Sequence, residues 1–172
     1  MRFHRAVPIA VYREGGPARS ALVARISDAE DRLTAVEVTY LEPNGLAAAG
    51  LRLPRKTVGV VPAGAAVRLS PVAQEMLVGE GVLTVLSAME RFRLPGWALM
   101  SANNLSRWRP PDEVRRVLIA ADRGPAGEGA AVRLYRRLRA LGLEARIRLP
   151  DPPFGDWNEA ARAVRKREER GR

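Results

Sequence analysis

Two acidic residues each follow an apolar stretch that has the composition of a buried β-strand. Glu80 comes directly after residues 76–79, and Asp122 comes directly after residues 117–121. In an open α/β sheet, functional side chains collect just past the carboxyl ends of the strands. Two carboxylates brought together at that edge would provide the oxygen ligands that a hard cation such as Mg²⁺ prefers. The sequence therefore predicts a Mg²⁺ site that contains Glu80 and Asp122.

Three further polar side chains could take part in the same chemistry. Asp156 and Glu159 have the spacing of a helix-starting capping box, in which an acid accepts a backbone N–H and a glutamate answers three residues later. Asp156 could instead bind a metal or a phosphate, and the two roles are compatible. Asn103 and Asn104 follow a predicted strand and could contact the phosphates or bases of a nucleic acid, although asparagines in such places often only form a turn.

The chain is strongly basic, with 29 Lys and Arg residues against 19 Asp and Glu residues and a formal net charge of +10. Such a chain attracts polyanions, because cations that neutralise phosphates release condensed counterions. Arginine, which dominates here, has a planar fork that suits phosphate, although a GC-rich genome would produce the same bias. In the predicted helix over residues 129–141, Arg133 and Arg137 lie off the apolar stripe, on either a nucleic-acid track or a solvated face.

Composition excludes several classes of protein and disfavours others. The chain has no cysteine, so disulfides, cysteine-ligated zinc and thiol nucleophiles are excluded. The only histidine, His4, leaves no Ser-His-Asp triad and no His-based zinc site. No apolar run reaches the roughly 18 residues of a transmembrane helix, and the N-terminal sequence has no signal-peptide core. We therefore expect a cytoplasmic protein that makes no use of a membrane.

The hydrophobic pattern changes near residue 75. Residues 1–74 carry short alternating stretches separated by turn signals, which predicts a small N-terminal subdomain of antiparallel strands, the last of them over residues 65–69. Residues 75–172 alternate apolar strands with helical patterns and end in a charged C-terminal tail. This alternation predicts about four mostly parallel strands with flanking helices. The expected fold class is α/β, with a Rossmann-type sheet preceded by a small antiparallel β subdomain.

Four ordered blocks of sequence carry a resemblance to a known family. They are a Glu-Gly stretch that leads into a helix, a Ser-Ala-Gly-Asn-Leu-like loop, a Pro-Pro-led apolar strand that ends in Asp, and an Asp-Trp-Asn-Asp-like motif. The blocks occupy residues 80–87, 101–105, 110–122 and 156–159. Together they resemble the Toprim domain, and most closely the Toprim modules of plasmid- and phage-type primases and primase–helicases. Upstream segments resemble the β unit that precedes Toprim in those proteins, so the resemblance spans nearly the whole chain.

The resemblance implies the Toprim fold and Mg²⁺ as the cofactor. In that family a Glu acts as an acid/base or metal-linked group and an Asp-x-Asp pair holds the metal. This implies a catalytic and metal-binding role for Glu80 and a metal-binding role for Asp122, with Asp156 assisting. Gly124 stands where the second Asp of the pair belongs, which removes one oxygen ligand, and Arg123 adds a positive charge that could contact nucleic acid. We therefore expect weakened Mg²⁺ binding.

These observations predict a primase-type module that binds DNA and nucleotides. It would carry out Mg²⁺-dependent nucleotidyl transfer for primer synthesis in the replication of a plasmid, phage or related mobile element. The chain has neither a cysteine-based zinc module nor a Gly-x-x-x-x-Gly-Lys-Ser/Thr ATPase loop, so we expect a helicase or template-reading partner, or a fragment of a larger primase. Two alternatives stay open: a degenerate module that binds DNA or a replication partner without catalysis, and a Toprim nuclease.

Overall fold

The computed structural model describes residues 1–12 and 15–171 and divides into two compact units, Met1–Pro62 and Ala63–Arg172. Arg172, the last residue of the expected tail, lies outside the described residues. The division falls earlier than the change of pattern at residue 75, because the short strand near residues 65–69 belongs to the second unit.

The first unit is built on a four-stranded antiparallel sheet with the order β1-β2-β3-β4. The strands are β1 (Arg2–Pro8), β2 (Ala18–Ser27), β3 (Leu33–Tyr40) and β4 (Arg55–Gly59). On β3, Val38 and Tyr40 pack with Ala21 and Ala48 in one cluster, and Glu37 and Thr39, which alternate with them, are buried as well. The Tyr40 hydroxyl donates a hydrogen bond of 2.6 Å to the carbonyl of Pro8. These contacts secure β1 to the middle of the sheet.

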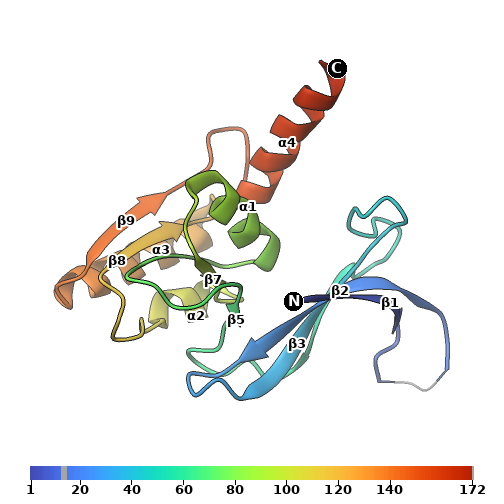
Figure 1. The fold of residues 1–172 in the computed structure, drawn as a ribbon, viewed down its shortest axis with the longest axis horizontal. Coiled ribbons are helices and arrows are strands. Elements are labelled where there is room, and N and C mark those ends of the chain that lie inside the picture. Colours follow the sequence, from blue (N-terminus) through green and yellow to red (C-terminus); the bar gives the residue numbers. More distant parts are fainter. Residues whose placement is uncertain (13–14, 172) are drawn as a thin grey trace. The chain divides into compact units, whose positions relative to one another are not determined.

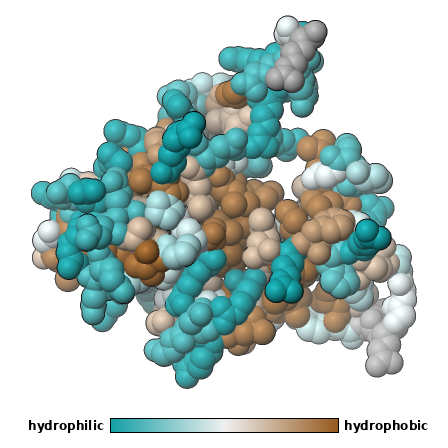
Figure 2. All heavy atoms as spheres, in the orientation of Figure 1, coloured by the Kyte–Doolittle hydropathy of each residue, from teal (hydrophilic) through white to brown (hydrophobic). Residues whose placement is uncertain are grey.

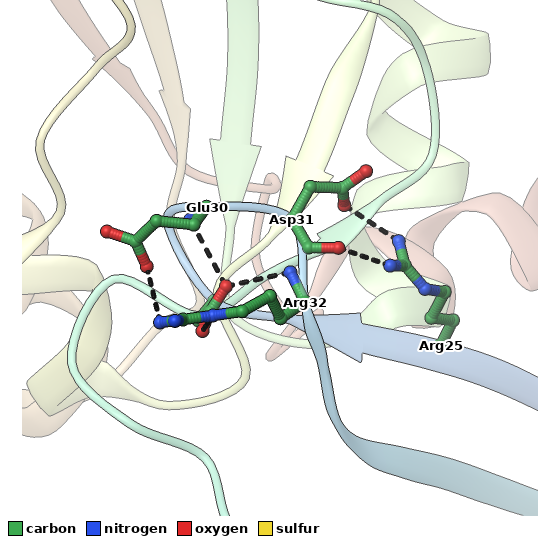
Figure 3. Close-up of polar contacts among 5 residues, drawn as sticks. Arg25, Glu30, Asp31 and Arg32 are labelled. Carbon is green, nitrogen blue, oxygen red and sulfur yellow. Dashed lines mark hydrogen bonds and ion pairs between the residues drawn. The ribbon is translucent and has the colours of Figure 1, made fainter.

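The turn between β2 and β3 is held by charged side chains (Figure 3). The Asp28 carboxylate accepts hydrogen bonds from the backbone N–H groups of Glu30 and Arg32 and from Arg32 Nε. Burial alone would raise the pKa of Asp28, but the hydrogen bonds from Arg32 and Glu30 lower it below its ordinary value. Arg25 donates to the carboxylate of Asp31, whose φ of 62° lies in the left-handed region. The turn therefore has a structural explanation and is not a candidate catalytic site.

The second unit contains a five-stranded sheet with the order β5-β7-β6-β8-β9 (Figure 1). The strands are β5 (Val67–Arg68), β6 (Glu75–Gly79), β7 (Gly96–Ala98), β8 (Arg116–Ala120) and β9 (Glu144–Arg148). Strands β6 to β9 are parallel, and only β5 runs antiparallel, beside β7. The expected α/β fold with about four parallel strands is confirmed. β5 joins this sheet, although its residues were expected in the N-terminal subdomain.

Helices flank the sheet of the second unit. They are α1 (Val82–Phe92), α2 (Ala102–Arg107), α3 (Pro125–Ala140) and α4 (Trp157–Arg170). α3 begins earlier than the sequence predicted. Its expected apolar stripe is confirmed for Ala131, Leu134 and Leu138, which are buried in the main core cluster with residues of β6, β7 and β8. Leu141, the fourth residue of that stripe, follows the helix and is exposed. α2 packs against α3, whereas α1 contacts β6, β7 and α4. The core therefore lies between the sheet and its helices.

The last helix is far more polar than the others. None of the residues of α4 is buried, and Figure 2 shows hydrophilic side chains along most of its length. Its first turn is anchored by Trp157, which meets Phe92 of α1 edge-to-face with ring centroids 5.0 Å apart. Arg165 also forms an ion pair with Glu90 at 2.6 Å. Among the described helices, none combines the length and the apolar character needed to cross a bilayer.

Candidate functional site

The strand order places Glu80 and Asp122 at the same edge of the sheet. β6 lies in the middle, and the chain continues from it first to β7 on one side and later to β8 on the other. The parallel register pairs Gly79 with Ala120, so Glu80 leaves the end of β6 beside the point where the chain leaves β8 toward Asp122. In doubly wound sheets, ligands bind in the crevice at such a reversal of strand order. The fold therefore provides the edge that the sequence predicted.

The backbone around Glu80 is fixed by its neighbours. The N–H of Leu99 donates to the carbonyl of Gly79, and the N–H of Met100 donates to the carbonyl of Glu80, each at 2.8 Å. The Glu80 side chain is half-buried. Burial raises the pKa of this carboxyl, and a hydrogen bond from the backbone N–H of Ala102 partly opposes the shift. A carboxyl group with a raised pKa at this edge is suited to proton transfer.

Asp122 is positioned by close packing against the start of α3. A Cβ atom added to Gly127 would lie 2.5 Å from the backbone oxygen of Asp122 and 3.3 Å from its Cβ. The helix can therefore approach the Asp122 loop this closely only because residue 127 is a glycine. The sequence carries a weak signal for this contact, since a glycine in a helix costs stability unless the packing requires it. The close contact that requires Gly127 is visible only in the structure.

Gly124 precedes α3 and adopts a backbone conformation that other residues avoid. Its φ is +108° and its ψ is 165°, which is accessible essentially to glycine alone. Among the described residues other than Gly124 and its two chain neighbours, no atom lies within 4 Å of the position that a Cβ would occupy. The replacement of the second family Asp by glycine is therefore accompanied by a local conformation that suits glycine. Space is available at this position, but a side chain there would strain the backbone.

Asp156 caps α4, and capping is one of the two roles that the sequence predicted for it. Its carboxylate accepts the N–H of Glu159 at 2.8 Å, and the Glu159 carboxylate accepts the N–H of Gly155 at 2.8 Å. The N–H of Arg123 donates to the carbonyl of Gly155 at 2.7 Å, and Arg123 Nε donates to the carbonyl of Pro150 at 2.7 Å. The loop that carries Asp156 is therefore attached to the loop that follows Asp122.

Two carboxylates, those of Glu80 and Asp122, follow adjacent parallel strands at this edge. Mg²⁺ is typically held by one or two carboxylates together with water and substrate phosphates, so the chemical type of these two side chains is compatible with that ion. Within residues 1–12 and 15–171, no three His, Cys, Asp or Glu side chains gather into a group that could hold a metal ion. Asp156 is thus not brought together with Glu80 and Asp122 as a third ligand, and its carboxylate is engaged at the helix start.

The structure gives Asn104 a structural role in place of the predicted contact with nucleic acid. The side chain is buried. Its Nδ2 donates to the carbonyls of Ala65 and Leu99 at 2.6 and 2.8 Å, and its Oδ1 accepts the N–H of Gly64 at 2.8 Å. An asparagine that is engaged in this way cannot reach a ligand without breaking these bonds. Asn103, by contrast, is exposed.

Replacing Asn104 with alanine is expected to lower the free energy of unfolding by about 2–3 kcal/mol, because two buried carbonyls and one partly buried N–H would lose their partner. Asn103→Ala is the matched control and should change stability by less than about 0.5 kcal/mol. Urea unfolding of the two variants measures the difference. Equal stabilities of the two variants would show that the Asn104 contacts contribute nothing.

Two arginines predicted to contact nucleic acid lie on α3. Arg133 is exposed. Arg137 donates from Nη1 to the carbonyl of Ser106 at 2.8 Å. Because α3 starts beside Asp122 and runs away from it, Arg137 lies toward the far end of the helix. The structure therefore does not bring Arg137 to the Glu80 edge. Trp97 and Trp108 are buried in the core and meet edge-to-face.

Comparison with protein families and solved structures identifies the fold independently. Residues 75–166 match the Toprim domain, and residues 1–69 match a domain of unknown function (DUF7146). No curated protein matches the chain. Among solved structures, the primase fragment of the bacteriophage T7 primase-helicase protein has a TM-score of 0.59 and 20% sequence identity, covering 88% of this chain and 61% of that one.

Two bacterial-type primase structures give similar results. A DNA primase domain from Pseudomonas aeruginosa has a TM-score of 0.55 and 18% identity, covering 92% of this chain and 52% of that one. The DnaG primase catalytic domain bound to single-stranded DNA has a TM-score of 0.52 and 16% identity, covering 88% and 54%. The chain therefore spans between half and two thirds of these structures. At such identities the likeness establishes the fold, and the Toprim match covers more than half of the residues. The chain belongs to the Toprim domain family.

Proposed function

We propose that the chain is a primase-type module that binds nucleic acid and carries out Mg²⁺-dependent nucleotidyl transfer for primer synthesis. The observation that supports this most strongly is the placement of Glu80 and Asp122 at the ends of adjacent parallel strands, at the strand-order reversal of a Toprim sheet. Replication of a plasmid, phage or related mobile element is the context in which we expect it. A helicase or a template-reading protein would be its partner.

In this proposal each residue at the edge has a distinct task. Glu80, with its raised pKa, accepts at a carboxylate oxygen the proton of the hydroxyl that attacks the α-phosphorus of a nucleoside triphosphate, while the bond to pyrophosphate, the leaving group, breaks. Asp122 supplies the second carboxylate and is held in place by the packing of α3 at Gly127. Glu80 and Asp122 would hold Mg²⁺, which would supply positive charge against the negative charge that develops on the phosphates. Asp156 holds the start of α4 and the loop joined to Arg123.

Binding of the nucleic acid is proposed to rest on charge. The net charge of +10 favours association with a phosphate backbone and makes that association sensitive to salt. Arg133 and Asn103 are exposed and remain our candidates for contacts with it. Arg123 also stays a candidate, although its Nε donates to the carbonyl of Pro150.

The direct test is extension of a labelled RNA primer that is already annealed to a DNA template, with nucleoside triphosphates and Mg²⁺. A pre-annealed primer removes the need for a template-reading partner. We expect products that lengthen with time and disappear when the metal is chelated. DNA binding that weakens steeply with salt but yields no product would favour the non-catalytic alternative. Shortening of labelled DNA would favour the nuclease.

The non-catalytic alternative is favoured by one specific observation, which is the glycine at residue 124. A comparison of Gly124→Asp with Gly124→Asn separates charge from backbone strain, because the two side chains have nearly the same shape. Both variants are expected to lose about 1–3 kcal/mol of stability, since φ is +108° at this position. Only Gly124→Asp should strengthen Mg²⁺ binding, by several-fold, in a calorimetric titration. Equal Mg²⁺ affinity in the two variants would contradict a metal site beside residue 124.

A further inference from the structure

A cavity of about 630 Å³ lies at the opposite end of the second unit's sheet from Glu80 and Asp122. It is lined by the segment that precedes β8, by the last turn of α3 and by Leu143, which precedes β9. Because β8 and β9 are parallel, the residues before them lie at the amino-terminal edge, whereas the proposed catalytic edge follows their carboxyl ends. The cavity is therefore separate from the site described above. Its volume is typical of a site that binds a ligand.

The lining combines cationic and apolar side chains. It includes Arg109, Arg115 and Arg137, and Asp112 is the only acidic side chain among the described residues that line it. The apolar part includes Val114, Leu141 and Leu143, and Leu141 is 63% exposed. An exposed leucine beside several arginines favours a ligand that has both an apolar group and negative charge.

Hydrogen bonds hold the walls of the cavity in place. Arg137 donates from Nη1 to the carbonyl of Ser106 at 2.8 Å. Arg115 donates from Nη1 to the carbonyls of Asp112 and Val114, and the N–H of Val114 donates to the carbonyl of Pro111 at 3.1 Å. A surface that is already ordered loses less conformational entropy when it binds.

We propose that this cavity binds an acidic segment of a partner protein, with one apolar side chain of that segment placed against Leu141 and Leu143. A single-stranded nucleic acid fits less well, because bases are normally held by stacking on aromatic rings and no aromatic residue is among those that line the cavity. The inference does not depend on whether the Glu80 edge is catalytic.

The test uses the full chain and a panel of fluorescein-labelled peptides, each made of aspartate and glutamate with one leucine or phenylalanine. Binding is measured by fluorescence anisotropy, with peptides of the same composition in which the acids are replaced by lysine as negative controls. Two variants probe the cavity, Arg109→Glu for the charge and Leu141→Ser for the apolar contact. Arg109 and Leu141 are both exposed, so the fold should tolerate either change. Their matched controls are Arg162→Glu and Val164→Ser, at exposed positions of α4.

We expect at least one acidic peptide to bind saturably, about tenfold more weakly to Arg109→Glu and several-fold more weakly to Leu141→Ser, with both control variants close to wild type. Amide NMR shifts caused by the peptide should cluster around Val114, Leu141 and Leu143. The proposal is overturned if no acidic peptide binds, or if the control variants weaken binding equally. It is also overturned if single-stranded DNA displaces the peptide and its own affinity falls in Arg109→Glu but not in Leu141→Ser.

Discussion

Glu80→Gln is expected to reduce primer extension by about 10²–10⁴-fold and, at neutral pH, to make the protein more stable. The loss of activity follows from removing the group that accepts a proton and binds the metal. The gain in stability follows from burial, because burial raises the pKa of Glu80 and ionisation of the carboxyl therefore costs free energy in the folded state. A glutamine carries no charge, yet its amide oxygen can still accept the N–H of Ala102. Activity and stability should thus change in opposite directions.

The predicted gain in stability of Glu80→Gln depends on pH. The pKa of Glu80 in the folded protein lies above its ordinary value of 4.5, so the folded state binds the proton more tightly than the unfolded state does. The contribution of Glu80 to the free energy of unfolding is therefore complete below pH 4.5 and is lost as the pH rises through the folded pKa. Glu80→Gln should match the wild type in acid and exceed it at neutral pH.

Thermal unfolding of the wild type and of Glu80→Gln measures this difference in stability. The melts are recorded in the presence of a chelator, in steps of about one pH unit from about pH 4 to about pH 8. Glu168→Gln is the matched control, because Glu168 is exposed on α4. A melting temperature of Glu80→Gln equal to that of the wild type at pH 7 would contradict the assigned burial of the carboxyl. Full primer extension by this variant would remove Glu80 from the mechanism.

Gly127→Ala is expected to lower the free energy of unfolding by about 1–3 kcal/mol, as is typical of overpacking. The new methyl group would lie 2.5 Å from the backbone oxygen of Asp122, so α3 has to move away from the loop that carries this carboxylate. Because Asp122 is one of the two proposed metal ligands, Mg²⁺ affinity should fall as well. The variant therefore couples helix packing to the proposed site.

Gly129→Ala provides the matched control for this prediction. Both glycines lie in α3, but a Cβ at residue 129 meets only the flexible end of Arg133, at 3.3 Å. The gain in helix propensity of about 0.5–1 kcal/mol applies to both variants, so Gly129→Ala should be neutral or more stable than the wild type. Urea unfolding distinguishes the two cases. If Gly127→Ala were stabilised to the same extent, the backbone of Asp122 would be able to move away from the new methyl group without any loss of stability. That result would contradict the prediction.

The sequence predicted the parallel sheet because buried parallel strands are nearly continuous apolar runs, as in β6 and β8. The same pattern could not reveal the strand order, which depends on how helices cross the sheet. The strand predicted over residues 65–69 was placed in the N-terminal subdomain, whereas β5 (Val67–Arg68) pairs with β7, because local alternation does not say which sheet a short strand joins. The capping box at Asp156 could be predicted from the sequence because its hydrogen bonds are local. Asp156 accepts the N–H of Glu159, three residues on, and Glu159 accepts the N–H of Gly155, four residues back.

The role of Asn104 could not be predicted, for a physical reason. An asparagine after a strand has the same local sequence whether its amide bonds to backbone or to a ligand. Its partners at Gly64 and Ala65 are about forty residues away in the chain, and only the folded unit brings them together. The contact between Gly127 and Asp122 was hidden in the same way, since a glycine in the first turns of a helix is visible in the sequence but the atom that it accommodates is not.

The most direct test of the central claim is a calorimetric titration of Mg²⁺ into the wild type, Glu80→Gln and Glu168→Gln. The proposed site at Glu80 and Asp122 predicts saturable binding to the wild type and to Glu168→Gln, and loss of that binding in Glu80→Gln. Absence of binding to the wild type, or equal binding to all three proteins, would contradict a Mg²⁺ site at this edge of the Toprim sheet.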